Sequence, residues 1–377
     1  MPERSSIHFM SGSKVHTQLA ELREKYLAQP GVKVWGYRRL YLQAGSWFTC
    51  FAVSYALLLL WAHGWWQVIL LSLSTIVSLA GFLINTMHDA NHGALADRRY
   101  GKYLYLTLEL VGASSRLWRI KHSEHHGKTN MVGADSDIDL PPLARMAPAQ
   151  PWRPWYYYQR YYIWLLYGLM ALRWFFVGDF QSLHRGTIGQ KKLRPFTPGQ
   201  WTTLLLAKLL AATWMLGIPL WLHHADYGAI TLAIFFGCAW TFGFMLSIIF
   251  QFAHCIDEAL FTSLKDVDSQ SLVHFYWDEN QALATSNYRS KWRIVNWLLD
   301  WFLGGLDHQI EHHLYQNLPH PHLKRLAPEV RRIFEENRLI YISHNSLWSA
   351  FVSHYHHLKK MGLPPQKMVP KIVQAAS

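Results

Sequence analysis

Residues 45–63 read GSWFTCFAVSYALLLLWAH and residues 65–87 read WWQVILLSLSTIVSLAGFLINTM, with Gly64 between them. Neither run contains Asp, Glu, Lys or Arg. A helix needs about 20 apolar residues to cross the hydrocarbon core of a bilayer, and both runs are of that length. The stretch therefore predicts a transmembrane helical hairpin, which is followed at once by HDANH at residues 88–92.

A second pair of apolar runs covers residues 201–223 and 228–252, with Lys208 as its one basic residue. The aromatic stretch 155–176 is a different case, because Arg160 and Arg173 leave too few uncharged residues between them to cross. We expect this stretch to lie at the membrane interface. The predicted fold is an all-α integral membrane protein with four transmembrane helices in two hairpins, interfacial helices and a cytoplasmic helical cap.

The distribution of basic residues predicts the orientation. The short turns around Gly64 and Asp226 contain no Lys or Arg, and basic residues in short loops mark the cytoplasmic side. Both termini should then be cytoplasmic in a multi-pass protein. The segments are an N-terminal segment (1–44), hairpin 1 (45–87), a cap region with two histidine motifs and the interfacial helices (88–200), hairpin 2 (201–252) and a second cap region with His254 and a third motif (253–377).

Composition narrows the function. Only 16% of the 377 residues are charged, against about 25% in soluble domains, and 51% are hydrophobic. The net charge of +12 fits anionic lipid headgroups better than nucleic acid, because apolar runs separate the basic segments. Three Cys without a CxxC pair exclude a disulfide framework and a structural zinc site. The 22 His are the unusual component and indicate imidazole chemistry.

Three histidine clusters lie just outside the apolar runs. They contain His88 and His92, then His122, His125 and His126, and finally His312 and His313 preceded by Gln309. Side chains at i, i+3 and i+4 share one helix face, so HxxHH and HxxxH present several imidazoles together. His254 ends the fourth run, on the same predicted face. Eight imidazoles exceed the needs of one ion, so we expect two metal ions.

The sequence also predicts roles for other polar residues and for the remaining histidines. Asp89, Glu124 and Glu311 are expected to orient the imidazoles through hydrogen bonds. His223 and His224 should lie at the opposite membrane face, and His354, His356 and His357, which lack helical ligand spacing, should be surface residues. Imidazole binds Fe, Zn, Cu and Ni, so ligand type alone does not name the metal.

The sequence resembles the membrane fatty acid desaturases, and in particular the front-end, linoleoyl-CoA desaturase-like branch. The resemblance rests on HDANH at 88–92, WRIKHSEHHGKTNMVGADSDI at 118–138 and GGLDHQIEHHL at 304–314. Gln309 stands where other desaturases have the first His of the third motif, as in front-end enzymes. One desaturase domain is expected over about residues 45–340.

The resemblance implies a di-iron oxidoreductase that uses O2 to introduce a cis double bond into an acyl chain carried on CoA or on a lipid, at a delta-6- or delta-5-like position. Its metal ligands would be His88, His92, His122, His125, His126, His254, His312 and His313. Gln309 would bind iron weakly, hold a water or line the substrate tunnel. Trp118 and Asn130 would contact the acyl headgroup or serve packing.

The front-end branch often carries a fused cytochrome b5 domain with an HPGG haem motif, and residues 1–44 contain no HPGG. We therefore expect no haem in this chain and a separate electron donor, either a ferredoxin or a cytochrome b5 with its reductase. The competing function is a di-iron hydroxylase or ketolase acting on a carotenoid, sterol, alkane or sphingoid lipid. A metal transporter is disfavoured, because it would place ionisable ligands within the spans. A histidine-rich scaffold without chemistry is the third alternative.

Overall fold

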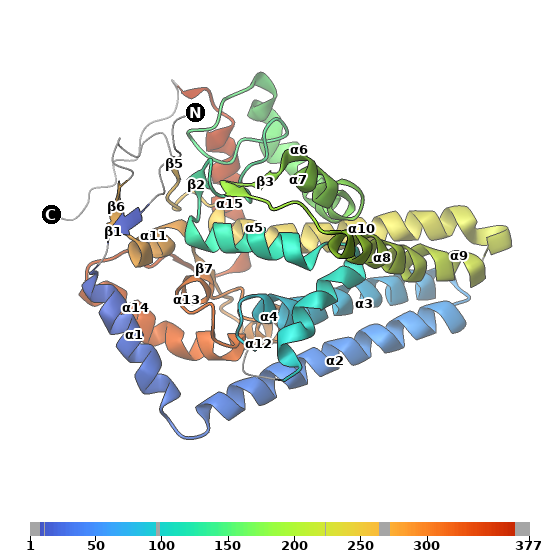
Figure 1. Ribbon diagram of the computed structural model, residues 1–377, viewed down its shortest axis with the longest axis horizontal. Coiled ribbons are helices and arrows are strands. Elements are labelled where there is room, and N and C mark those ends of the chain that lie inside the picture. Colours follow the sequence, from blue (N-terminus) through green and yellow to red (C-terminus); the bar gives the residue numbers. More distant parts are fainter. Residues whose placement is uncertain (1–7, 11, 96–98, 223, 264–271, 366–377) are drawn as a thin grey trace.

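The computed structural model describes residues 8–10, 12–95, 99–222, 224–263 and 272–365. Most of these residues are helical, as predicted. Long helices form a bundle that projects from a broader cap made of shorter helices (Figure 1). The helices of the bundle are α2 (Val32–Leu60), α3 (Trp65–Leu83), α8 (Pro198–Ala212), α9 (Ile218–Leu222) and α10 (His224–His254).

In the described part of the chain, five helical stretches are long and apolar enough to cross a membrane: Val32–Leu60, Trp65–Asn91, Pro154–Arg185, Pro198–Leu222 and Gly228–His254. Four of them coincide with the predicted spans, although the first ends at Leu60, three residues before the predicted end at 63. The third is the aromatic stretch, which the sequence assigns to the interface. The first helix begins 13 residues before the predicted boundary at 45, because its charged initial turns continue out of the apolar region into the cap.

Three of these stretches contain a π-helical turn that joins two α-helical parts. The turns are η1 (Ile84–His88) before α4 (Asp89–Asn91), η4 (Trp174–Gly178) between α6 (Gln159–Arg173) and α7 (Asp179–Arg185), and η5 (Thr213–Gly217) between α8 and α9. A π turn inserts an extra residue and rotates the face that follows it, and such turns are common at functional sites. The turn η1 ends at His88.

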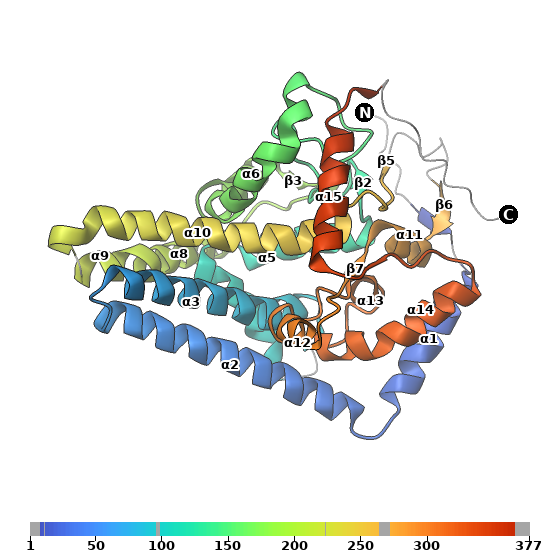
Figure 2. The same cartoon turned by 180° about the vertical axis from the view of Figure 1, so that it is seen from behind.

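Helix α6 lies obliquely across α10 in the cap half of the molecule (Figure 2). The two backbones meet closely at Gly168 and Gly243. A Cβ added at Gly243 would lie 2.5 Å from the Gly168 carbonyl oxygen, and one added at Gly168 would lie 2.0 Å from Trp240 Nε1. Glycine is therefore required on both helices at this crossing.

The remaining helices build the cap. They are α1 (Lys14–Leu27), η2 (Gly101–Val111), α5 (Ser115–Gly127), η3 (Pro154–Tyr158), α11 (Trp277–Ala284), α12 (Arg293–Phe302), α13 (Gln309–Leu314), η6 (His320–His322), α14 (Leu323–Glu336) and α15 (Leu347–Met361).

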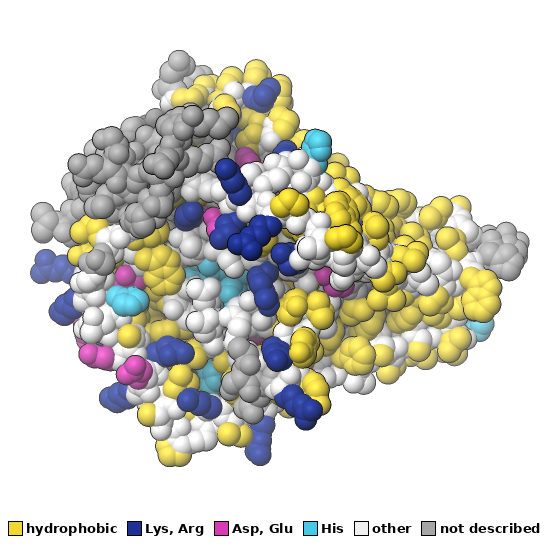
Figure 3. Space-filling model, in the orientation of Figure 1, with side chains coloured by type: hydrophobic (Ala, Val, Ile, Leu, Met, Phe, Trp, Pro, Cys, Tyr) yellow, Lys and Arg dark blue, Asp and Glu magenta, His cyan; other side chains and the backbone are white. Residues whose placement is uncertain are grey.

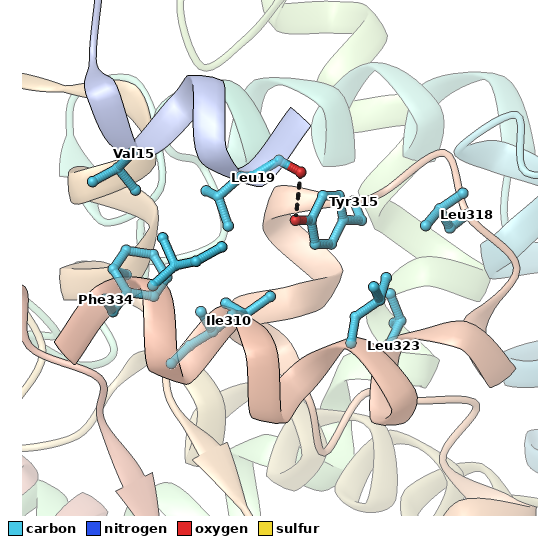
Figure 4. Close-up of a cluster of buried hydrophobic side chains, with 11 residues drawn as sticks. Val15, Leu19, Ile310, Tyr315, Leu318, Leu323 and Phe334 are labelled. Atoms are coloured by element: carbon cyan, nitrogen blue, oxygen red, sulfur yellow. Dashed lines mark hydrogen bonds between the residues drawn. The ribbon is translucent and has the colours of Figure 1, made fainter. Parts of the chain in front are cut away.

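A cluster of buried apolar side chains fixes the short helix α13 in the cap (Figure 4). Ile310 of α13 is fully buried between Leu19 of α1 and Phe334 of α14. The Tyr315 hydroxyl donates to the Leu19 carbonyl at 2.9 Å. Because α13 has only six residues, this packing rather than helix propensity holds it in place.

Among the described residues there are four two-stranded ladders, of which three join distant segments and one is a local hairpin. β1 (His8–Met10) pairs in parallel with β6 (Leu272–Tyr276), β2 (Met131–Val132) with β5 (Thr262–Ser263), and β7 (Asn287–Tyr288) with β8 (Ser343–His344), whereas β3 (Thr187–Ile188) and β4 (Lys191–Lys192) are antiparallel. The β2–β5 ladder ties the segment after α5 to the segment after α10, and thus holds together the chain around the second histidine motif and His254.

The surface divides along the molecule. Hydrophobic side chains cover the projecting bundle, and the Lys and Arg side chains gather over the cap and where the apolar surface ends (Figure 3). A bilayer around the apolar part would leave the charged part in water.

Candidate di-metal site

Helix α5 positions the second histidine motif, and two carboxylates hold its start. The Ser114 N–H donates to Asp179 at 3.1 Å, and the Ser115 N–H donates to Glu109 at 3.0 Å. Free N–H groups and the helix dipole both favour negative charge at a helix N-terminus. Asp179 is paired in turn with Lys208, the one basic residue of the predicted spans, at 3.0 Å.

The predicted ligands come together from five elements: η1, α4 with its C-terminal residue, α5, the end of α10, and α13. Ligand atoms of His88, His92, His122 and His312 lie within 4.8 Å of one another, and so do those of His125, His254 and His313. We call these the four-histidine group and the three-histidine group. His126 lies beside the first group, because its Nε2 is 3.2 Å from Nε2 of both His122 and His312.

Hydrogen bonding among the imidazoles does not account for this arrangement. His122 Nε2 lies 3.1 Å from His88 Nε2, 2.8 Å from His92 Nε2 and 3.2 Å from His126 Nε2. One imidazole nitrogen has either a single proton or a single lone pair, so it cannot satisfy three such partners. Buried nitrogens of His125 (Nε2) and His313 (Nε2) have no hydrogen-bond partner within the described residues. Convergent lone pairs and unpartnered nitrogens fit metal ions.

Outer hydrogen bonds orient the three-histidine group. His125 Nδ1 donates to Asp135 at 2.8 Å, and His313 Nδ1 donates to Gln281 Oε1 at 2.7 Å. His254 Nδ1 is 3.3 Å from the carbonyl of Ala284. In each case the bond at Nδ1 leaves Nε2 as the free lone pair, which is the usual arrangement of metal-binding histidines.

The sequence did not predict these partners. Asp135 belongs to the GADSDI stretch that carries part of the family resemblance, but no role was expected for it. No sequence pattern links Gln281 to the histidines, because it comes from a separate helix, α11. The carboxylates that were expected to orient the imidazoles have other partners. Glu124 is 3.4 Å from Lys128, and Asp89 accepts from His320 Nδ1 at 3.0 Å and its N–H at 2.9 Å.

Glu311 likewise accepts from Asn287 at 2.8 Å and from Tyr341 at 2.7 Å. The expectation for these three carboxylates was therefore wrong. The physical reason for Glu124 is helical geometry: at about 100° per residue, the position two after His122 points to the opposite side of α5 from the ligands.

Three further predicted site residues are placed as follows. Gln309 is buried near His254, and its Oε1 has no hydrogen-bond partner in the described part of the chain. The Trp118 ring stacks on His122 with centroids 4.2 Å apart. Asn130 is fully buried with φ of 58°, and its amide donates to the His254 carbonyl at 2.8 Å. Trp118 and Asn130 thus support ligands, which favours the packing alternative for both.

Two of the histidines expected at the surface are buried in α15, so that expectation was wrong for them. His354 Nδ1 is 2.6 Å from the Cys255 carbonyl and its Nε2 is 2.9 Å from the Tyr167 hydroxyl, whereas His357 Nε2 is 2.8 Å from the Met146 carbonyl. The face of α15 that carries them packs on α10 and α6. His356, on the other face, is exposed as expected. His223 lies outside the described residues.

Burial keeps most of the clustered imidazoles neutral. It lowers the pKa of His122, His126, His312 and His313 well below the usual value, and neighbouring imidazoles add to the effect. Burial also lowers the pKa of His125, but the Asp135 carboxylate outweighs it and the net shift is upward. Neutral imidazole is the form that binds metal.

Comparison with known proteins identifies the family. The family model described as "Fatty acid desaturase" matches residues 63–345, which is more than half of the chain. The chain belongs to the fatty acid desaturase family. The resemblance seen in the histidine motifs is thereby confirmed.

Named relatives are of the front-end type. The chain is 34% identical over 285 residues to the acyl-lipid (8-3)-desaturase of Physcomitrium patens, covering 74% of this chain and 57% of the relative. It is 32% identical over 291 residues to the sn-1 linoleoyl-lipid 6-desaturase of Synechocystis sp., covering 76% of this chain and 78% of the relative. It is 29% identical to the probable Delta(5) fatty acid desaturase C of Dictyostelium discoideum, covering 77% of this chain and 63% of the relative. The chain thus spans less than two thirds of the moss and Dictyostelium relatives.

Proposed function

We propose that this protein is a membrane-bound, O2-dependent acyl-lipid desaturase that introduces a cis double bond on the carboxyl side of an existing one. One observation carries the proposal: imidazoles from five elements, most of them buried, form two adjacent groups with unpartnered nitrogens. The names of the family and of the relatives support the reaction and the class of substrate.

Two iron ions fit the donor set. His88, His92, His122 and His312 would hold one ion, with His126 beside them, and His125, His254 and His313 would hold the other. Gln309 supports a fourth position in the smaller group, because its unpartnered Oε1 is buried near His254. The iron, when bound, supplies the strong oxidant that an unactivated methylene C–H bond requires.

The chain's own residues orient this oxidising centre and keep water from it. Asp135 and Gln281 fix the ring nitrogens that face the ions. His125, His126, His254 and His313 are each at most 2% exposed, so the acyl chain would react away from bulk water. The neutral imidazoles take no part as acids at neutral pH, since burial depresses the pKa of most of them.

We further propose four spans with both termini and the site on the cytoplasmic face. In this topology α6 lies at the interface, which its oblique path across α10 supports (Figure 2). Exposed Tyr157, Tyr158 and Tyr161 also support it, because aromatic side chains concentrate at membrane interfaces. A crossing α6 would move the second motif to the face opposite His254. Electrons would come from a separate carrier, a ferredoxin or a cytochrome b5 with its reductase.

Expression in a host that contains oleate, linoleate and linolenate tests the function. We expect a new double bond between the carboxyl group and an existing double bond, located by mass spectrometry of derivatised lipids. His125→Ala should abolish it while the protein still inserts in the membrane. An oxygenated lipid in place of a new double bond would indicate the hydroxylase or ketolase alternative.

A further inference from the structure

A cleft of about 480 Å³ opens beside the four-histidine group, between α4, η2 and α5. His92 lies in its wall, and His92 and His122 are the two proposed ligands that are not fully buried in the described part of the chain. The cleft therefore leads from the surface to the edge of the proposed metal site. Its volume is in the range of small-molecule sites.

Two cations line this cleft. Arg119 Nε donates to Asn91 Oδ1 at 3.2 Å, and its guanidinium lies 4.3 Å from the centre of the Tyr105 ring. These two contacts fix the plane of the guanidinium but use only one of its five N–H groups. In the described ranges, neither the terminal nitrogens of Arg119 nor the Lys102 ammonium has a hydrogen-bond acceptor. The pair therefore offers N–H groups to an anion, and a guanidinium suits phosphate in particular.

The surroundings of the cleft point to a lipid as the source of that anion. Helix η2, which supplies Lys102 and Tyr105, also exposes Tyr103 and Leu106 to 54% and 41%, and Tyr100, directly before the helix, is 70% exposed. An element with exposed aromatic and apolar side chains beside cations is typical of the headgroup level of a membrane. Two cations within one concave site match a small anionic group, whereas an electron-carrier protein requires a broad complementary surface.

We infer that this cleft binds the phosphate-bearing headgroup of the acyl substrate, with Arg119 and Lys102 as its anion-binding residues. The inference rests on the proposed desaturase function and deepens it. A headgroup held beside His92 would fix the start of the acyl chain relative to the metal site, so the double bond would be counted from the carboxyl end. The phosphate could belong to a membrane phospholipid or to CoA, and the two sources are separated below.

Binding of soluble short-chain probes to the full-length, iron-loaded protein in detergent tests the inference without requiring turnover. The probes are dioctanoylphosphatidylglycerol, octanoyl-CoA and, as the neutral control, monogalactosyl dioctanoylglycerol. For Arg119→Gln we expect the Kd of the phosphate probe to rise about tenfold, and for Arg119→Lys to rise less, because the charge remains. Lys33→Gln, which removes an exposed cation at the start of α2, should leave all Kd values unchanged.

The outcomes separate the explanations. If Arg119→Gln raises the Kd for dioctanoylphosphatidylglycerol, the site binds a phospholipid. If it raises only the Kd for octanoyl-CoA, the site binds CoA. A Kd within twofold of wild type for both phosphate probes, or an equal loss for the galactolipid, would overturn the inference. The inference would also be overturned if Arg119→Gln left lipid binding unchanged and raised the KM for ferredoxin. If wild type binds phosphate probes through Arg119 but forms no double bond with any donor, the proposed function fails and the binding site stands.

Discussion

Asp135→Asn is the substitution that most directly tests how the site is held. Among the described residues, the Asp135 carboxylate accepts three hydrogen bonds. Oδ2 accepts from His125 Nδ1 at 2.8 Å and from the Asn130 N–H at 3.0 Å, and Oδ1 accepts from the Asp137 N–H at 2.9 Å. An asparagine has one carbonyl oxygen and one NH2 group. Whichever way it is turned, a donor faces a donor at one of these contacts.

The expected cost follows from this geometry. A hydrogen bond to a charged group is worth about 1.5–3 kcal/mol, and losing an outer partner of a metal-binding histidine usually lowers affinity or activity by about 10- to 100-fold. We therefore expect Asp135→Asn to lower turnover by about 10- to 100-fold and to weaken iron retention during dialysis. The measurements are product formation per protein and iron content by mass spectrometry, with the melting temperature as a check of folding.

Asp137→Asn provides the matched control. Its carboxylate is 4.0 Å from His125 Nδ1 and is paired mainly with Lys121 at 2.6 Å. The loss of turnover should stay below about threefold, as for a partly exposed ion pair. If Asp135→Asn keeps its iron and its turnover within twofold of wild type, or if Asp137→Asn loses as much, the assignment of Asp135 as the residue that orients His125 is wrong.

Three further predictions concern other parts of the site and cap. His312→Ala should lose iron and all turnover, whereas His356→Ala on the exposed face of α15 should lose neither; full activity of the first variant would refute the ligand set. Gln309→His should retain iron and Gln309→Leu should lose roughly half of it, and a Leu variant with both ions would remove Gln309 from the proposed coordination. Burial lowers the pKa of His357 to about 3, so the unfolded chain binds a proton below about pH 6.5 that the folded chain does not. Stability should then fall by about 2 kcal/mol for this group between pH 7 and 5, and His357→Gln, assayed by thermal unfolding across that range, should lose less than wild type.

Local signals predicted the segments that enter the membrane. The length of the uncharged runs located the helical stretches that contain residues 45–60 and 65–87, because a charge within a bilayer is costly and its absence is informative. The same signal missed the 13 residues by which α2 extends toward the cap, since helical structure continues where hydropathy changes. The residue at which a helix begins and the residue at which the chain enters the apolar region are therefore two different properties.

The spacing of the histidines predicted which imidazoles share a helix face, but not which residues form hydrogen bonds with them. His125 and His126 follow from the i, i+3, i+4 rule, whereas Gln281 comes from a helix some 30 residues before His313, with no periodic link to it. His357 shows the converse: it follows His354 by three residues and shares its helix face, but this side of α15 packs on α10 and α6, so His357 is buried as a core residue. Contacts between distant segments decide both cases.

Two helices each contribute to both histidine groups. Helix α5 places His122 in the four-histidine group and His125 in the three-histidine group, and α13 does the same with His312 and His313. The relative placement of the two groups therefore depends on the helical rise of about 1.5 Å and the rotation of about 100° per residue. Inserting or deleting one residue between His122 and His125 would rotate one ligand by about 100° relative to the other. Such a change would damage both groups together, so the two proposed metal positions cannot vary independently in length-altered chains.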